Sequence, residues 1–305
     1  MITSKDNDKI KLIRKLMTDK KTRKETGLFV LEGARLIDEA IRSGRVKIEA
    51  VYVSESVFPS LPPFDGCTKG GMILVKDSVF AAITDTVNAQ GVISLCRILR
   101  GGILPPEKVR TAECRPYNSN ICRSLILDRI RDPGNLGAII RTAAAAGYNT
   151  IYCIDCTDSF GSKSLRASMG GIFYVDIIET DYSIIDELKN NGVSIIAADM
   201  DGIDVFEVQS SLRAEAIDGF REKPIGEAIQ ITDSCIADIG LLRVARNDGQ
   251  SGIHNHLCLA IGSEADGLDS RIKNSATLTV SIPMQNVESL NAAVSAGILM
   301  YILRN

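Results

Sequence analysis

The stretch that decides the fold is residues 257–291, which read LCLAIGSEADGLDSRIKNSATLTVSIPMQNVESLN. Its first apolar run, Leu257 to Ile261, ends at Gly262, and its second, Leu278 to Ile282, ends at Pro283. Short β-type runs that end in glycine, proline and amide residues are typical of parallel strands whose carboxyl ends form a ligand crevice. A pair of ordinary strand-to-helix turns is the alternative that this stretch alone leaves open.

The residues before this stretch repeat a pattern of strand and helix. Strand-like runs alternate with stretches of helical periodicity, in the order 125–127, 136–146, 150–154, 162–169, 174–178, 184–191 and 193–198. Such alternation predicts a parallel sheet with helices on both faces. We expect Asn135 to be the N-cap of the helix at 136–146, with Gly147 just past its end.

The first hundred residues show a separate α/β pattern. Strand-like runs lie at 28–31, 48–53, 72–75 and 91–97, with a helix at 34–41. This part has no histidine and no pairing of a nucleophile with a base, so a binding domain is the economical interpretation. The predicted organisation is a binding domain at 1–100, a glycine- and proline-rich linker at 101–123 and a second domain at 124–305, with an insertion at about 203–256.

Residues 1–24 combine positive charge with a helical apolar pattern. The cations are Lys5, Lys9, Lys11, Arg14, Lys15, Lys20, Lys21, Arg23 and Lys24, against Asp6, Asp8 and Asp19. Ile10, Ile13 and Met17 recur at helical spacing, which predicts an amphipathic helix with a basic outer face. That face is either a solvated run of charge or a contact for the phosphate backbone of a nucleic acid.

Composition limits the class of protein. With a formal net charge of −3 over 305 residues, nucleic-acid binding would need a local basic patch. The eight cysteines follow no disulfide spacing, and we expect reduced thiols in a cytoplasmic protein. Cys153 and Cys156 have no second pair and no histidine cluster beside them, so neither a metal site nor redox chemistry is expected. No apolar run reaches the roughly 18 residues of a membrane span.

Three motifs stand in order at the ends of the expected strands. They are DPGNLGAIIR at 132–141, AIGSEADGL at 260–268, and the pair IPM at 282–284 and ESLNAAV at 288–294. Together they resemble the signature motifs of the SpoU (TrmH-like) family of SPOUT RNA methyltransferases. The resemblance covers roughly residues 124–305, and the first hundred residues look like the substrate-binding extension of that family.

The resemblance implies an enzyme that uses S-adenosylmethionine to methylate a ribose 2′-hydroxyl of RNA. Ribosomal RNA is the first expectation for the substrate, and transfer RNA is the alternative. A homodimer and a deep C-terminal trefoil knot are also implied, with the knot segments at 262–267 and 282–290. The expected fold class is thus α/β, with a small α/β RNA-binding domain before a parallel-sheet SPOUT domain.

The resemblance also assigns roles to single residues. The matching cofactor-contacting positions are Gly262, Ile282 and Leu290. The matching polar positions near the reacting ribose are Asn135, Arg141, Glu264, Ser289 and Asn291. The family's proposed base corresponds to Arg141, but guanidinium groups rarely lose a proton in proteins, so stabilising developing alkoxide charge is an alternative role. Helix capping is the alternative for Asn135 and Ser289.

Two other classes of protein compete with this interpretation. One is an RNA-binding member of the fold that has lost catalysis, against which the matching Asn135, Arg141, Glu264 and Asn291 argue. The other is a nucleotide-dependent oxidoreductase, but a Gly-x-Gly-x-x-Gly turn does not follow the first strand.

Overall fold

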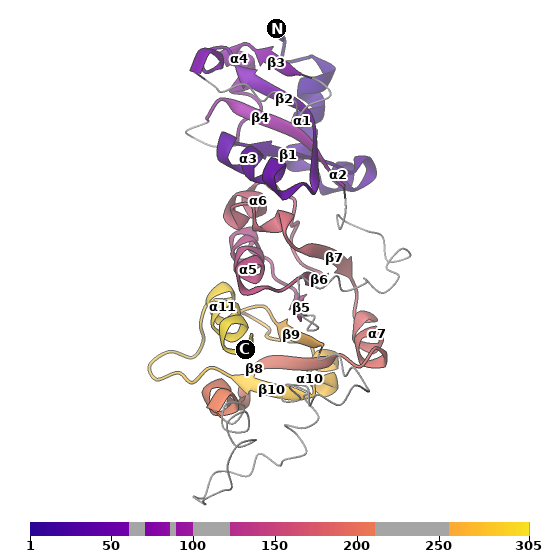
Figure 1. Ribbon diagram of the computed structural model, residues 1–305, viewed down its shortest axis with the longest axis vertical. Coiled ribbons are helices and arrows are strands. Elements are labelled where there is room, and N and C mark those ends of the chain that lie inside the picture. Colours follow the sequence, from indigo (N-terminus) through magenta and orange to yellow (C-terminus); the bar gives the residue numbers. More distant parts are fainter. Residues whose placement is uncertain (61–70, 86–89, 100–122, 211–255, 305) are drawn as a thin grey trace, which may run out of the picture. The chain divides into compact units, whose positions relative to one another are not determined.

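The computed structural model describes residues 1–60, 71–85, 90–99, 123–210 and 256–304 (Figure 1). These residues fall into two compact units. The first unit holds the described residues of Met1–Leu104, Asp132–Arg141 and Thr157–Ile177. The second holds those of Pro105–Arg131, Thr142–Cys156 and Ile178–Asn305. The division passes through helix α5 (Pro133–Ala146) and strand β7 (Asp176–Thr180).

A four-stranded sheet in the order β1-β4-β2-β3 forms the first part of the first unit. Its strands are β1 (Leu28–Glu32), β2 (Val46–Ser54), β3 (Met72–Val75) and β4 (Val92–Ile98). Strand β4 is antiparallel to both neighbours, and β3 is parallel to β2. The helices around it are α1 (Asp8–Thr18), α2 (Lys20–Thr26), α3 (Ala34–Ser43), α4 (Asp77–Phe80) and the short η1 (Phe58–Ser60). The unit also contains α6 (Ser162–Ser168) and η3 (Gly171–Phe173).

The basic N-terminal segment forms two helices where a single amphipathic helix was expected. Asp19 ends α1, and its carboxylate accepts hydrogen bonds from the backbone N–H groups of Lys21 and Thr22 at the start of α2. An aspartate that caps a new helix interrupts the preceding one because its own backbone is extended. The apolar stripe on α1 packs into the core of the four-stranded sheet through Ile10, Ile13 and Leu16.

A six-stranded sheet in the order β10-β8-β9-β5-β6-β7 dominates the second unit. Its remaining strands are β5 (Arg123–Asp128), β6 (Thr150–Ile154), β8 (Ser194–Asp204), β9 (Leu257–Ile261) and β10 (Leu278–Ser281). The pairs β5–β6, β5–β9, β8–β9 and β8–β10 are all parallel, which confirms the predicted parallel sheet. The pairing of β8 with β10 has a register shift, because Thr279 pairs with Ala197 and the next residue, Val280, pairs with Ile203. The residues of β8 between Ala197 and Ile203 therefore form a bulge.

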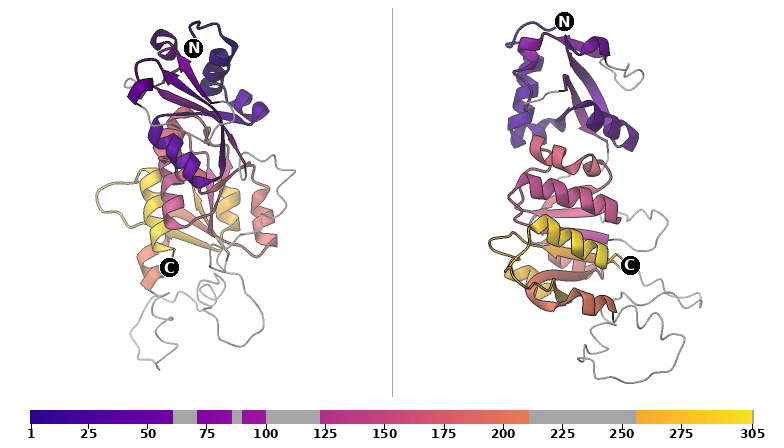
Figure 2. Two further views of the ribbon diagram at one scale, coloured as in Figure 1. Left: turned by 45° about the horizontal axis from the view of Figure 1, so that its top comes forward. Right: turned by 90° about the vertical axis from the view of Figure 1, so that its left-hand side faces the viewer.

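Helices cover both faces of this sheet, as the alternation of strand and helix predicted (Figure 2). Apolar side chains of α7 (Ile184–Asn190) and α10 (Ser270–Ser275) pack into one core with alternate residues of β5, β8 and β9. Helix α11 (Ala292–Ile302) contacts β9 and lies on the opposite side of the strands from α7 and α10 (Figure 2). The carboxyl ends of β5 and β9 and the start of α11 therefore belong to one layered structure.

Several predicted boundaries differ from the observed ones. Helix α5 begins at Pro133 rather than at residue 136, and β7 begins at Asp176 rather than at residue 174. Strand β8 continues to Asp204, inside the predicted insertion at 203–256, and residues 205–210 are helical. Most of that insertion, and residues 101–122 of the predicted linker, lie outside the described residues. In the described ranges, no helix is both long and apolar enough to cross a membrane.

Candidate active site

Helix α5 carries two of the expected site residues, Asn135 and Arg141, and begins with a well-defined cap. One carboxylate oxygen of Asp132 accepts a hydrogen bond from the Asn135 backbone N–H, at 2.9 Å. Pro133 is the first helical residue, a position where the missing N–H has no cost. Asp132 is therefore the cap, and the expectation that Asn135 caps the helix is wrong. The second oxygen of Asp132 lies 3.0 Å from the Lys163 ammonium.

Two glycines seat α5 on its neighbours within the first unit. A Cβ at Gly137 would lie 2.5 Å from the Ser164 carbonyl oxygen, and one at Gly171 would lie 2.8 Å from the Arg141 Cα. Real Cβ atoms essentially never come within 3.0 Å of such atoms, so both positions require glycine. Backbone contact with α6 and η3 thus fixes the part of α5 from which the exposed Arg141 side chain projects.

Residues Gly262–Gly267 form a closed turn after β9, in the second unit. The Gly267 N–H donates to the Ser263 carbonyl at 3.0 Å, and the Asp266 N–H donates to the Ser263 hydroxyl at 3.1 Å. A Cβ at Gly262 would lie 2.3 Å from the Gly267 carbonyl carbon, which the closed turn cannot accommodate. Gly262 is therefore required by the turn itself, and its contact with a cofactor stays a prediction.

The start of α11 is tied to this turn. The Asn291 side chain caps the helix by accepting from the N–H groups of Ala293 and Val294, at 3.0 and 3.4 Å. One carboxylate oxygen of Glu264 accepts from the Ala292 N–H at 3.2 Å and from the Asn291 amide at 3.4 Å. The structure thus brings Glu264 and Asn291 together, and a carboxylate at a helix N-terminus is electrostatically favourable. Asn291 is the cap, so the alternative of Ser289 as a cap is wrong.

A largely exposed segment that is neither helix nor strand joins β10 to α11. Ile282 and Leu290 are half-buried at its two ends, whereas Ser289 is exposed. In the described part of the chain, residues 283–290 make no backbone–backbone hydrogen bonds. Residues 285–289 are exposed, and an exposed stretch of this kind can present backbone groups to the polar edges of a nucleoside, which a site uses for orientation. The segment has the donors and acceptors that a nucleoside-containing cofactor needs.

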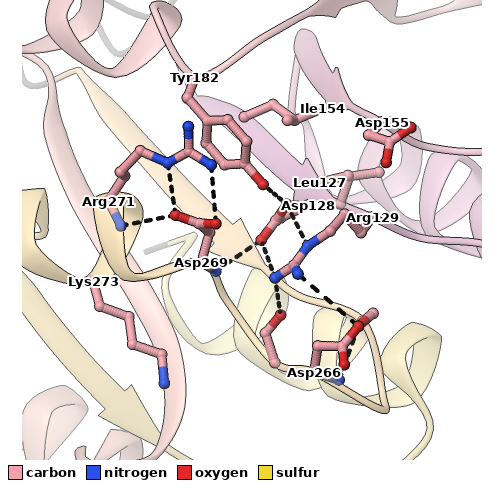
Figure 3. Close-up of polar contacts among 12 residues, drawn as sticks. Leu127, Asp128, Arg129, Ile154, Asp155, Tyr182, Asp266, Asp269, Arg271 and Lys273 are labelled. Carbon is pink, nitrogen blue, oxygen red and sulfur yellow. Dashed lines mark hydrogen bonds and ion pairs between the residues drawn. The ribbon is translucent and has the colours of Figure 1, made fainter.

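Sequence reasoning missed a polar network at the carboxyl end of β5, which Figure 3 shows. Asp128 lies at its centre, and Arg129, Tyr182 and Asp269 surround it. The only local signal was a pair of charged residues directly after an apolar strand. No metal site accompanies it: the described residues hold no group of three or more His, Cys, Asp or Glu side chains that could bind a metal ion.

Comparison with known proteins places these features in a family. The model of the SpoU rRNA Methylase family matches residues 123–301, and that of the MRM3-like substrate binding domain matches residues 7–94. The 23S rRNA (guanosine(2553)-2′-O)-methyltransferase RlmP of Bacillus subtilis (strain 168) is 30% identical over 99% of this chain and 98% of its own. The mitochondrial rRNA methyltransferase 3 of Xenopus tropicalis is 28% identical over 92% of this chain and 71% of its own.

Solved structures agree in fold over nearly the whole chain. The crystal structure of an AdoMet-bound rRNA methyltransferase from Sinorhizobium meliloti superposes with a TM-score of 0.70 at 26% identity, covering 99% of this chain and 96% of that one. A TrmH-family RNA methyltransferase structure from Porphyromonas gingivalis superposes with a TM-score of 0.69 at 20% identity, covering 100% and 98%. The second likeness shows the fold alone. The parallel sheet, the glycine turn after β9, the capped helix after β10 and these matches together show that the chain belongs to the SpoU rRNA methylase family.

Proposed function

We propose that the protein transfers a methyl group from S-adenosylmethionine to a ribose 2′-hydroxyl of ribosomal RNA. The observation that carries the proposal is the link from Glu264 to the start of α11, which follows the exposed residues 285–289. Bound there, S-adenosylmethionine supplies an activated, electrophilic methyl group. The protein itself must then bind, align and orient the reacting groups.

The cofactor side of the proposed site lies in the second unit. Residues 283–290 offer hydrogen bonds to the adenosine edge, and the half-buried Ile282 and Leu290 provide apolar contact at either end. Glu264 fixes the distance between the turn at 262–267 and α11 through its bonds to Ala292 and Asn291. Gly262 permits the closed turn. Gly262, Ile282 and Leu290 are thus the proposed cofactor-binding residues, and Glu264 keeps its expected role as a polar group near the reacting ribose.

The ribose side of the proposed site requires Arg141 and Asn135. Arg141 projects from α5 as an exposed side chain. Because guanidinium groups rarely lose a proton in proteins, its proposed role is to bind a phosphate and stabilise developing negative charge on the 2′-oxygen. Asn135 is half-buried and lies six residues before Arg141, and it offers an amide for the ribose or the arginine. Ser289 and Asn291 match the family's other polar positions near the reacting ribose.

The N-terminal domain is the proposed RNA-binding part. Lys5, Lys9, Arg14, Lys15 and Lys24 are exposed there, which supports a contact with the phosphate backbone. Arg23 does not belong to that surface, because its side chain is 5% exposed and pairs with Asp158.

A homodimer with a trefoil knot completes the proposal. In α11, Val294 is 50% exposed and Tyr301 is 42% exposed. Ile298 lies four residues after Val294 and three before Tyr301, so the three side chains form one apolar stripe along the helix. Such a stripe is suited to contact with a second copy of the chain. The knot is supported by the strand order, because β9 lies between β5 and β8 although it follows both. Sedimentation should give a dimer for the wild type and a monomer for Val294→Arg. The proposal includes a cytoplasmic location, which the likeness to the Bacillus subtilis enzyme supports.

The test is methyl transfer in vitro followed by mass spectrometry of the ribonucleosides. Wild-type protein, S-adenosylmethionine and unmodified ribosomal RNA should yield one new 2′-O-methylated nucleoside, and transfer RNA should yield none. Arg141→Ala should reduce the yield to background, whereas Lys189→Ala, which removes an exposed cation from α7, should not change it. A methylated base, or transfer into transfer RNA alone, would contradict the proposal.

A further inference from the structure

The carboxylate of Asp128 is completely buried and saturated with donors. It is the last residue of β5 and has no exposed surface. Its Oδ1 accepts from the Tyr182 hydroxyl at 2.8 Å, and its Oδ2 accepts from the Asp269 N–H at 2.8 Å. A buried carboxylate destabilises the fold unless hydrogen-bond donors surround it. Moving a donor away from Asp128 would therefore be unfavourable, and this keeps the surrounding groups in place (Figure 3).

Arg129 completes the shell and extends it to the turn after β9. Its guanidinium donates to both oxygens of Asp128, from Nε and Nη2 at 3.1 Å each, and Nη2 also donates to the Gly267 carbonyl at 3.3 Å. Nη1 lies 3.9 Å from the Asp266 carboxylate. Arg129 has a φ of 57°, which is the left-handed region of the backbone. This conformation is energetically unfavourable for any residue other than glycine. In this conformation the guanidinium contacts both its own neighbour Asp128 and the turn after β9.

Tyr182 and Arg271 close the network on its other side. The Arg271 guanidinium carbon lies 3.5 Å from the centroid of the Tyr182 ring, and its nitrogens bind the Asp269 carboxylate at 2.8 and 3.1 Å. Burial, together with the hydrogen bond to Asp128, raises the pKa of Tyr182 to about 12, so its hydroxyl remains a donor at neutral pH. The pKa of Asp269 is lowered by its hydrogen bond from Arg271, so that carboxylate stays charged.

These contacts act on one loop. Asp266, Gly267 and Asp269 all belong to the segment Gly262–Asp269, and each is held from the end of β5. At the other end of the segment, Glu264 holds the start of α11. The segment therefore has two anchors, one to the strand beside it and one to the helix after residues 283–290.

We propose that Asp128 and Arg129 are positioning residues that hold Gly262–Asp269 in the conformation that binds the cofactor. This inference rests on the proposed function, because it assigns cofactor binding to that segment. The two residues act through Gly267 and Asp269 and do not touch the reacting atoms. Loss of the network therefore weakens the binding of S-adenosylmethionine and leaves the binding of RNA and the chemical step unchanged.

The test compares Arg129→Gly and Asp128→Asn with the wild type. Glycine adopts the left-handed conformation without strain, so Arg129→Gly removes the guanidinium without adding backbone strain, and any loss of stability comes from the donors that Asp128 loses. Calorimetry should show the Kd for S-adenosylmethionine rising about 10- to 100-fold in both variants, the range expected when hydrogen bonds to a charged group are lost. The KM for the cofactor should rise likewise, while the KM for RNA and the kcat at saturation stay within about two-fold.

The outcomes separate this inference from the proposed function. If the wild type does not bind S-adenosylmethionine, the proposed function fails and this inference fails with it. If the wild type binds but Arg129→Gly binds equally well, the inference alone is overturned. If Asp128→Asn does not fold, Arg129→Gly decides the question, with its thermal unfolding midpoint as the check on stability. A rise in the KM for RNA with an unchanged Kd for the cofactor also overturns it.

Discussion

The backbone of Gly171 lies directly against the backbone of Arg141, so that a methyl group on Gly171 would be 2.8 Å from the Arg141 Cα. The placement of the arginine thus depends on a residue thirty positions away that carries no functional group. Gly171→Ala must push this part of α5 away from η3. Because misplacement by about 1 Å can cost roughly 100-fold in rate, we expect kcat to fall about 10- to 100-fold.

Methyl transfer at saturating cofactor and RNA measures that effect of Gly171→Ala. The Kd for S-adenosylmethionine should stay at its wild-type value, because the cofactor residues lie in the second unit. A wild-type kcat in a folded Gly171→Ala protein would show that α5 yields without moving the arginine.

Glu264 should act through its acceptor oxygen at the start of α11. Glu264→Ala removes the bond to the Ala292 N–H and should lower the free energy of unfolding by about 1 kcal/mol, the typical value of a helix cap. It should also weaken cofactor binding. Glu264→Gln keeps an acceptor and should recover most of both losses. Equal losses in the two variants would mean that the charge matters, and not the hydrogen bond.

The basic face of α1 should bind RNA through phosphate charge. Arg14 and Lys15 are both exposed there, and each phosphate contact contributes roughly one unit to the slope of log Kd against log salt. Arg14→Gln with Lys15→Gln should therefore reduce that slope by about two, for any RNA sequence. Lys47→Gln is a suitable control, since Lys47 is already paired with Glu49. An unchanged slope would identify the face as a solvated run of charge.

Tyr182 should make the stability depend on alkaline pH. An unfolded tyrosine ionises near pH 10, whereas burial and Asp128 raise the pKa of Tyr182 to about 12. Its contribution to stability is therefore complete below pH 10 and is lost as the pH rises toward 12. In Tyr182→Phe, urea unfolding between pH 9 and 12 should show a shallower decline than in the wild type. Tyr148 and Tyr152, whose pKa values are also raised by burial, act alike in both proteins.

Local sequence patterns predicted the strands and most helices because each rests on short-range periodicity. The runs at 150–154 and 257–261 became β6 and β9 without change, and the alternation of elements correctly indicated a parallel sheet. The resemblance of three motifs correctly identified the family. Cap positions were less predictable. Both Asp132 and Asn135 are good caps, and the fit of Pro133 to the first helical position decided between them.

Contacts between distant residues were beyond sequence reasoning. Tyr182 and Asp269 are 54 and 141 positions from Asp128, so only the fold reveals that they share its carboxylate. The same holds for Arg23, which looked like one more surface cation and is instead buried against Asp158, 135 positions away. Charge and periodicity identify candidates, but pairing in three dimensions decides which of them remain available to a ligand.

The closed shell around Asp128 also constrains how this part of the sequence can evolve. A buried carboxylate cannot lose a donor cheaply, so a change of Tyr182 or Arg129 alone is penalised while Asp128 remains. Residues 128, 129 and 182 should therefore vary together among relatives, either all kept or all replaced by an apolar set. Motif comparisons that consider one residue at a time would miss such covariation.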